Sequence, residues 1–234
     1  MKALVLDEHG GLDRLHVVAD KPVPAVSAGH VLIRVGASSF NYHDVFTVNG
    51  MPGIKVPLPV VIGLDLAGTI REIGEGVEGW EVGDRVLINP LKPDVGLMGE
   101  MVDGGMAEYA LVDARQLIRL PAAVSFEQAA ALPVAYGTAH RMLITHKTVK
   151  AGDRVLILGA SGGVGTACVI LAKLLGAEVI ACAGSDEKGE RLKALGADHV
   201  INYREERFEG EVRRLTKRKG VDVVFEHVGV DTWN

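Results

Sequence analysis

A strand that stops at a cluster of glycines constrains this chain more than any other segment. The apolar run 155–158 is followed by Gly162, Gly163 and Gly165, and helix-forming residues then continue to about residue 175. A buried strand, a tight glycine turn and a helix N-terminus together form an anion site, because backbone N–H groups and the positive end of the helix dipole face the ligand. The segment therefore predicts binding of a dinucleotide through its diphosphate.

The surrounding sequence supplies the context that this motif requires. Apolar runs alternate with helix-forming segments from residue 154 onward, which predicts a parallel sheet with right-handed crossovers. The expected strands are 154–158, 178–182, 199–201 and 221–226, and the expected helices are 163–175, 186–195 and 205–217. We expect an α/β, doubly wound Rossmann sheet that is truncated after its fourth strand, since the complete fold has six. The residues expected against the diphosphate are Ser161, Gly162, Gly163 and Val164.

The first half of the chain has a different pattern. Short apolar or alternating runs at 2–6, 30–36, 66–73, 85–88 and 106–112 predict β-strands in a compact barrel or sandwich. Ser125 then precedes a helix expected over 128–132, Pro133 interrupts it, and a second helix is expected over about 138–145. We expect a β-domain over 1–124, and linker helices with the nucleotide-binding domain over 125–234.

Composition restricts the class of protein further. The chain is 48% apolar and 24% charged, as in a soluble globular protein, and its net charge of −5 argues against nucleic-acid or anionic-membrane partners. No apolar run reaches membrane length, and no signal peptide is evident. Cys168 and Cys182 have neither metal nor redox spacing, which favours a reduced, cytoplasmic compartment.

The end of the second predicted strand favours NADPH over NADH. NAD-binding proteins place an acidic residue about 20 residues beyond the loop, on the ribose 2′-OH, but Ala183 occupies that place here. Ser185 and Lys188 are placed to donate to a 2′-phosphate instead. Asp186 is the counter-argument, although its position suits a cap of the next helix. Lys188 could equally be a solvated helix residue.

Several motifs resemble the medium-chain dehydrogenase/reductase superfamily. They occupy residues 57–68, 83–86, 104–109, 130–133 and 160–165, and residues 195–205 are especially similar to the zinc-free, zeta-crystallin-like quinone oxidoreductase branch. The resemblance implies a GroES-like N-terminal domain, a Rossmann domain and NADPH as cofactor. It also implies that Tyr203 lies beside the adenosine 2′-phosphate, that Thr138 lies near the nicotinamide, and that the complete protein forms a homodimer.

The same resemblance implies that the catalytic zinc of alcohol dehydrogenases is missing. The positions of its two cysteines and its histidine correspond to Asn41, Ala130 and Leu64. These residues offer no thiolate or imidazole ligand. The four-cysteine lobe of the structural zinc is also missing, because residues 89–99 contain no cysteine. We therefore expect no metal.

Without a Lewis acid, hydride transfer to an already electrophilic acceptor is the easier chemistry. The predicted substrate is a quinone or another α,β-unsaturated carbonyl. Asn41 could hydrogen-bond the acceptor carbonyl, or it could be a turn-forming residue bonded to backbone. His43 could protonate the reduced acceptor, in a position where alcohol dehydrogenases keep a proton-relay hydroxyl, or it could be a surface histidine. Tyr42 could replace a tyrosine of many quinone reductases that is Phe46 here.

Two other classes of function remain open. An alcohol dehydrogenase-like enzyme or a reductase of enoyl thioesters would share these motifs. A truncated, non-catalytic nucleotide-binding protein is the alternative from outside the enzymes.

Overall fold

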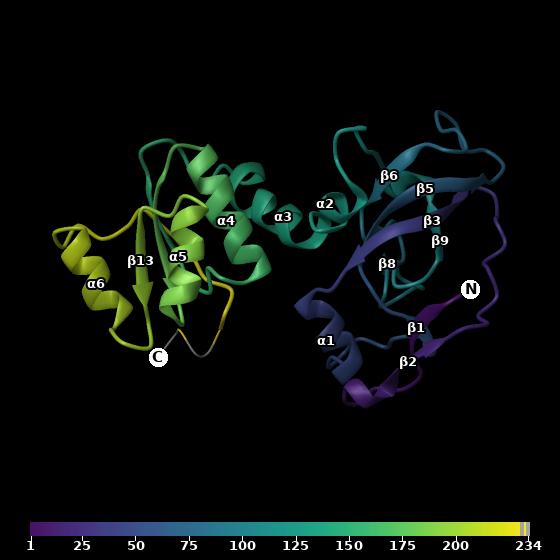
Figure 1. Ribbon diagram of the computed structural model, residues 1–234, viewed down its shortest axis with the longest axis horizontal. Helices are drawn as coiled ribbons and strands as arrows, with labels where there is room; N and C mark the ends of the chain where they lie inside the picture. Colours follow the sequence, from purple (N-terminus) through teal and green to yellow (C-terminus); the bar gives the residue numbers. More distant parts are fainter. Residues whose placement is uncertain (230–231, 233–234) are drawn as a thin grey trace. The chain divides into compact units, whose positions relative to one another are not determined.

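The computed structural model describes residues 1–229 and 232. Contacts divide the chain into two compact units, Met1–Val134 and Ala135–Asn234 (Figure 1). The helix that follows Ser125 lies in the first unit, whereas the sequence analysis placed it in the second domain. Within the described part of the chain, no helix is long and apolar enough to cross a bilayer.

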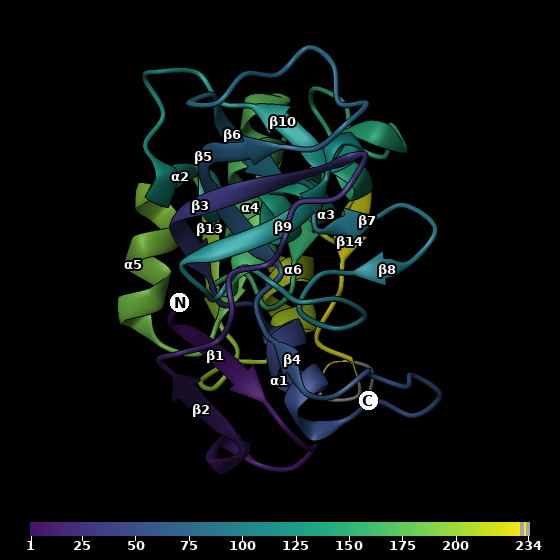
Figure 2. The ribbon, with the colours of Figure 1, turned by 90° about the vertical axis from the view of Figure 1, so that its right-hand side faces the viewer.

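A five-stranded antiparallel sheet forms the body of the first unit, and Figure 2 shows its strands side by side in the order β10-β6-β5-β3-β9. Alternate residues of these strands point into one core, where Val31, Ile33, Ile70 and Val86 are almost fully buried. The strands are β3 (His30–Ser39), β5 (Asp65–Ile73), β6 (Arg85–Ile88), β9 (Tyr109–Asp113) and β10 (Leu117–Arg119).

Smaller elements complete this unit. A three-stranded sheet has the order β2-β1-β4, and β7 pairs with β8 in a hairpin. The strands are β1 (Ala3–Leu6), β2 (Leu15–Val18), β4 (Val60–Val61), β7 (Leu91–Lys92) and β8 (Gly96–Leu97), and two 3₁₀ turns cover Leu12–Arg14 and Ala114–Gln116. The strands β2, β4, β7, β8 and β10 were not predicted. Three of them, β4, β7 and β8, have only two residues, too few to show a period of two, and β2 and β10 have no fully buried residue that would mark an apolar face.

Two helices of this unit are fixed by their caps. The helix α1 (Tyr42–Asn49) follows β3 directly, with Asn41 as its N-cap in an extended conformation. The helix α2 (Phe126–Ala130) is capped by Ser125, whose Oγ accepts from the backbone N–H of Gln128 at 3.2 Å, and the Gln128 side chain accepts from the Ser125 N–H at 3.0 Å. This reciprocal capping confirms the predicted capping signal at Ser125, although the helix begins two residues before the expected start at residue 128.

The second unit contains a parallel sheet with the strand order β13-β12-β11-β14. Its strands are β11 (Arg154–Ile157), β12 (Glu178–Ala183), β13 (His199–Asn202) and β14 (Val223–Phe225), joined by α4 (Gly163–Leu174), α5 (Asp186–Ala194) and α6 (Phe208–Leu215). Figure 1 shows α4 and α5 along one side of the sheet and α6 along the other. The predicted doubly wound, Rossmann-type arrangement is confirmed.

Both faces of this sheet are covered by apolar residues. Val155, Ile157 and Val179 pack with the α4 residues Ala167 and Cys168 on one face. Leu156, Leu158, Ile180 and Cys182 pack with Phe208 and Val212 of α6 on the other. Burial on both faces explains why the central strands are continuous apolar runs in the sequence.

Two helices flank the turn before Pro133, as the sequence predicted, but the expected start of the second helix near residue 138 is wrong. Pro133 begins the helix α3 (Pro133–His140) instead of interrupting a helix, and a π-helical turn over Arg141–Thr145 follows. Proline suits the first position of a helix, because its missing N–H would have no partner there and its φ is already helical.

Candidate active site

The glycine loop joins β11 to α4. Gly159 has a φ of +61°, which a residue with a side chain rarely adopts, and Gly162 is the N-cap of α4 in an extended conformation. The first N–H groups of α4 have no partner within the helix and point out of its N-terminus. The chain therefore offers backbone donors and the positive end of the helix dipole at one place.

The loop glycines have two different roles. A Cβ added to Gly162 would meet only the Gly159 carbonyl oxygen at 3.5 Å, and one added to Gly163 would meet only the Ala135 Cβ at 3.5 Å, among the residues that the structure describes. A Cβ added to Gly165 would lie 2.3 Å from the Gly159 carbonyl oxygen. Gly165 is thus needed for close packing of the helix, whereas Gly162 and Gly163 leave the outer surface of the loop open to a ligand. The loop fits a diphosphate.

The helix α3 passes beside this loop. Ala135 lies against Gly163, as the Cβ distance above shows, and the predicted nicotinamide contact Thr138 lies one turn further along α3 with an exposed side chain. Residues three apart share a helix face. Ser161 is exposed and Val164 is half-buried at the start of α4.

Polar and cationic residues gather at the end of β12. A Cβ added to Gly184 would lie 2.6 Å from the Tyr203 hydroxyl oxygen and 3.5 Å from the Arg204 Nε, so both side chains reach over this glycine. Tyr203 is held there by a backbone bond from its N–H to the Ala183 carbonyl at 3.1 Å. The structure brings Tyr203 to the end of β12, together with Ser185, and it adds Arg204, which was not predicted from the sequence. The sequence signal that could have indicated Arg204 is that a basic residue directly follows Tyr203.

The cap of α5 differs from the prediction. Ser185 is its N-cap, and its Oγ accepts from the Lys188 N–H at 3.4 Å, while Asp186 lies inside the first turn. Asp186 was predicted to be the cap, but its Oδ1 accepts from the Asn202 side chain at 3.0 Å. Ser185 takes the cap because it has the extended conformation that a cap requires. Its hydroxyl hydrogen can still be donated to a ligand.

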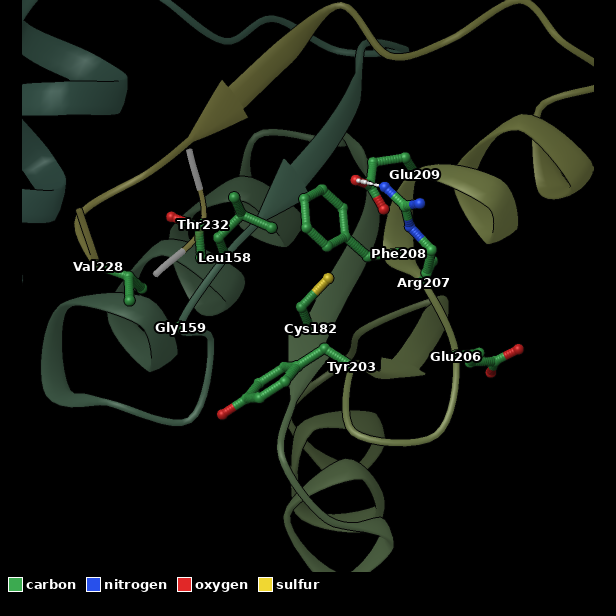
Figure 3. Close-up of a pocket in the computed structure, with 10 residues that line it drawn as sticks. All are labelled: Leu158, Gly159, Cys182, Tyr203, Glu206, Arg207, Phe208, Glu209, Val228 and Thr232. Atoms are coloured by element: carbon green, nitrogen blue, oxygen red, sulfur yellow. Dashed lines mark hydrogen bonds and ion pairs between the residues drawn. The ribbon is translucent and has the colours of Figure 1, made fainter. Parts of the chain in front are cut away.

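A cavity of about 480 Å³ adjoins this region at the carboxyl ends of the strands (Figure 3). Its lining comes from the ends of β11, β12 and β13, from the start of α6 and from the segment after β14: Leu158, Gly159, Cys182, Tyr203, Glu206, Arg207, Phe208, Glu209, Val228 and Thr232. Burial raises the pKa of the Cys182 thiol to about 12, so this thiol stays protonated and packs as an apolar group. Open α/β sheets bind ligands at this edge.

The first unit contains the predicted catalytic residues. Asn41 donates from Nδ2 to Asp65 Oδ2 at 2.9 Å, and its backbone N–H donates to Asp44 Oδ2 at 2.7 Å. Asp65 also accepts from the Ser39 hydroxyl at 3.1 Å and from the Val134 N–H at 3.1 Å. Burial raises the pKa of Asp65 to about 6, against the lowering effect of these hydrogen bonds. Asn41 is therefore both a helix cap and part of a buried side-chain network.

His43 and Asp44 do not form an acid–base pair with each other. Asp44 closes the first turn of α1, and the His43 Nε2 lies 2.7 Å from the Glu100 Oε2. Glu100 comes from a loop 57 positions away, which is why the sequence did not reveal it. Tyr42 is exposed and packs edge-on against the ring of Phe46, with ring centroids 5.1 Å apart.

The positions that hold zinc in alcohol dehydrogenases do not fit a catalytic metal here. Leu64 and Ala130 are buried apolar side chains, and the Asn41 amide is bonded to Asp65. Within residues 1–229 and 232, no three His, Cys, Asp or Glu side chains lie close enough to hold a metal ion together. That the protein binds no zinc stays a prediction, which elemental analysis of the purified protein would test.

Comparisons with known proteins match both halves of the chain. Residues 27–122 match the alcohol dehydrogenase GroES-like domain, and residues 163–234 match the zinc-binding dehydrogenase family. A zinc-type alcohol dehydrogenase-like protein of Schizosaccharomyces pombe is 36% identical over 99% of this chain and 70% of its own length. This chain belongs to the medium-chain dehydrogenase/reductase superfamily. Membership confirms the resemblance drawn from the motifs.

Other relatives place the chain among the quinone oxidoreductase-like members of that superfamily of oxidoreductases. Human quinone oxidoreductase is 34% identical over 97% of this chain, and an NADPH-dependent alkenal/one oxidoreductase of Arabidopsis thaliana is 35% identical over 98%. The chain spans 66% of the length of the human protein and 58% of that of the plant protein.

Solved structures share the fold closely. A structure described as an NAD-dependent alcohol dehydrogenase is 41% identical, with a TM-score of 0.92, over 98% of this chain and 71% of its own. Escherichia coli quinone oxidoreductase complexed with NADPH is 31% identical, with a TM-score of 0.89, over all of this chain and 68% of its own. One of these two structures is thus described with NAD and the other with NADPH, so the likeness alone does not choose between the two cofactors.

Proposed function

We propose that the protein transfers hydride from NADPH to quinones or other α,β-unsaturated carbonyls without a metal ion. The observation that carries the cofactor assignment is the set of donors around Gly184. Tyr203 and Arg204 reach over Gly184, Ser185 caps α5 beside it, and Lys188 lies in the first turn of α5. Ala183 provides no carboxylate to hold a 2′-OH or repel a 2′-phosphate. Charge-assisted hydrogen bonds from such donors favour a phosphate.

The glycine loop would hold the rest of the cofactor. The N–H groups at Gly163 and Val164 would donate to the diphosphate. The Gly162 N–H itself donates to the Gly159 carbonyl at 3.1 Å, and the open face of Gly162 would let the diphosphate approach. Thr138 of α3 would lie beside the nicotinamide. When bound, the cofactor would supply the hydride and its electron pair. Positioning the acceptor ring is then the main task of the chain's own residues.

Asn41 would orient the acceptor carbonyl. Its amide has two N–H donors, of which one is committed to Asp65. Asp65 thereby fixes the rotation of the amide, and the second N–H is left for an acceptor oxygen. Such a preorganised donor stabilises the charge that develops when hydride arrives.

The names of the relatives support the acceptor class. Quinone oxidoreductase and alkenal/one oxidoreductase both describe conjugated carbonyl substrates. These acceptors delocalise the incoming charge themselves. Hydride transfer to them would therefore need no metal ion at the positions that hold zinc in alcohol dehydrogenases, where this chain has apolar and amide side chains. A simple alcohol would need the missing Lewis acid.

Quinone-dependent oxidation of NADPH, measured with and without a chelator, tests this proposal. We expect turnover that the chelator leaves unchanged and that is slower with NADH. A rate lost on chelation would contradict the metal-free mechanism, and equal rates with NADH would contradict the phosphate site. NADPH binding without turnover would favour a non-catalytic nucleotide-binding protein, and turnover with enoyl thioesters alone would favour that reductase class.

A further inference from the structure

The pair formed by His43 and Glu100 is the strongest titratable cluster that the proposed function leaves without a role. The His43 Nε2 and the Glu100 Oε2 are 2.7 Å apart, and the two side chains are 27% and 6% exposed. Within the described residues, His43 is the only hydrogen-bond partner of the Glu100 carboxylate. A buried carboxylate needs such a partner, so the two side chains fix each other.

The placement of the ring is informative. His43 lies in the first turn of α1, two residues beyond the N-cap Asn41. Glu100 takes Nε2, whereas no hydrogen bond among the described residues involves Nδ1. The ring of Phe46 lies edge-on to the imidazole, with 6.3 Å between the ring centroids.

This geometry matches a need of the proposed reaction. A quinone or enone that accepts a hydride gains an electron pair, and its oxygen then requires a proton. A histidine whose tautomer and orientation are fixed by a carboxylate is a common proton donor in such steps. No other histidine in the described residues pairs with a buried carboxylate.

We propose that Glu100 is a positioning residue that holds His43 to protonate the oxygen of the reduced acceptor. In this step the Nδ1–H bond of the imidazolium breaks, its electron pair stays on Nδ1, and the proton forms the O–H bond of the product. The neutral ring keeps its Nε2–H on Glu100, and a proton from solvent restores the imidazolium. The step rests on the proposed function, because it needs an acceptor that has received hydride.

Nuclear magnetic resonance of the ring tests the positioning without turnover. In the wild-type chain we expect a slowly exchanging proton on the His43 Nε2. It should be lost in Glu100→Gln and kept in Glu8→Gln, a matched control in which an exposed acid that pairs with Arg14 becomes an amide. Fast exchange of this proton in the wild-type chain would overturn the positioning role.

Kinetics with a series of quinones tests the proton transfer. Electron-rich quinones give basic reduced oxygens that need a donor, whereas electron-poor quinones give stable anions. We expect His43→Gln to lower kcat about 100-fold for electron-rich quinones and only slightly for electron-poor ones. Glu100→Gln should lower kcat about 10-fold with the same dependence, and it should add nothing in a His43→Gln background.

The outcomes separate this step from the proposed function. In one outcome, the wild-type chain oxidises NADPH with quinones while His43→Gln and Glu100→Gln have the same kcat as Glu8→Gln for every quinone. That result would overturn the proton step and leave the proposed function standing. An equal loss for all quinones would assign the pair a structural role and would also overturn it. A folded wild-type chain that turns over no quinone would overturn the proposed function and this step together.

Discussion

Asn41 donates one N–H of its side chain to Asp65 across 2.9 Å, and Asp65 is only 1% exposed. The helix cap in the first unit is thereby tied to a carboxylate that the surrounding protein shields from water. This relationship gives Asn41 a structural role, and the substrate-orienting role that we propose for its second N–H does not compete with it, although the sequence left the two roles as alternatives.

Replacement of Asn41 should therefore affect both stability and substrate use. Asn41→Ala removes a partner of a buried carboxylate, which costs about 1–3 kcal/mol in the free energy of unfolding, and it should raise KM for quinones. Denaturant unfolding and steady-state kinetics measure the two effects. Asn49→Ala, at the exposed end of the same helix, is the control, and a stability equal to that of this control would contradict the account.

Asp65 should make stability depend on pH in an unusual direction. Burial raises its pKa to about 6, so the folded chain binds a proton that the unfolded chain releases near pH 4. Between about pH 4 and 6 the unfolded state binds fewer protons, and stability falls as pH rises, by at most about 3 kcal/mol from this group.

The comparison with Asp65→Asn isolates this contribution. Asp113 acts in the opposite direction, because hydrogen bonds from Arg115 lower its pKa to about 2, but it is present in both chains. We expect the stability of the wild type relative to Asp65→Asn to decrease from pH 4 to pH 7 in denaturant titrations. A difference that is constant over this range would show that the carboxylate is not desolvated.

Two loop glycines should respond differently to the same methyl group. Gly165→Ala brings its Cβ within 2.3 Å of the Gly159 oxygen, an overlap with rigid backbone that should cost about 1–3 kcal/mol or more in stability. Gly162→Ala has room for the methyl group, 3.5 Å from the nearest atom, but places it where the diphosphate would lie. We expect near-normal stability and at least about tenfold weaker NADPH binding for Gly162→Ala, measured by calorimetry. Normal NADPH affinity in this variant would place the cofactor elsewhere.

Selectivity for the 2′-phosphate should reside in the residues around Gly184. Arg204→Ala or Lys188→Ala should weaken NADPH binding about tenfold and leave NADH binding unchanged, because only NADPH carries the phosphate that these cations would contact. Arg191→Ala on α5, where the arginine pairs with Glu187 at 2.7 Å, is the matched control. Parallel losses for both nucleotides would contradict a phosphate contact.

Local sequence signals were sufficient for much of the fold. The β11–loop–α4 segment was predictable because an apolar run, glycines and helix formers follow one another directly. Caps were predictable where one residue type dominates, as at Ser125. At the start of α5, Ser185 and Asp186 are both good caps, and only the backbone conformation decides between them.

The candidate site was less predictable, because its partners are distant in sequence. Nothing in the residues around His43 indicates Glu100, and nothing near Asn41 indicates its bond to Asp65. Both contacts depend on how the first residue of β5 and the turn that contains Glu100 pack against the start of α1. Single-sequence patterns carry no information about such long-range pairing, so these residues appeared only with the three-dimensional structure.

Transfer of an isotope from cofactor to acceptor tests the central claim most directly. NADPH deuterated at the hydride-donating carbon of its nicotinamide is supplied with an α,β-unsaturated ketone, with a chelator present, and the product is examined by mass spectrometry. We predict one deuterium at the β-carbon of the saturated ketone, and less product when deuterated NADH replaces NADPH. A saturated product without deuterium, or no product from a chain that binds NADPH, would contradict hydride transfer by this protein.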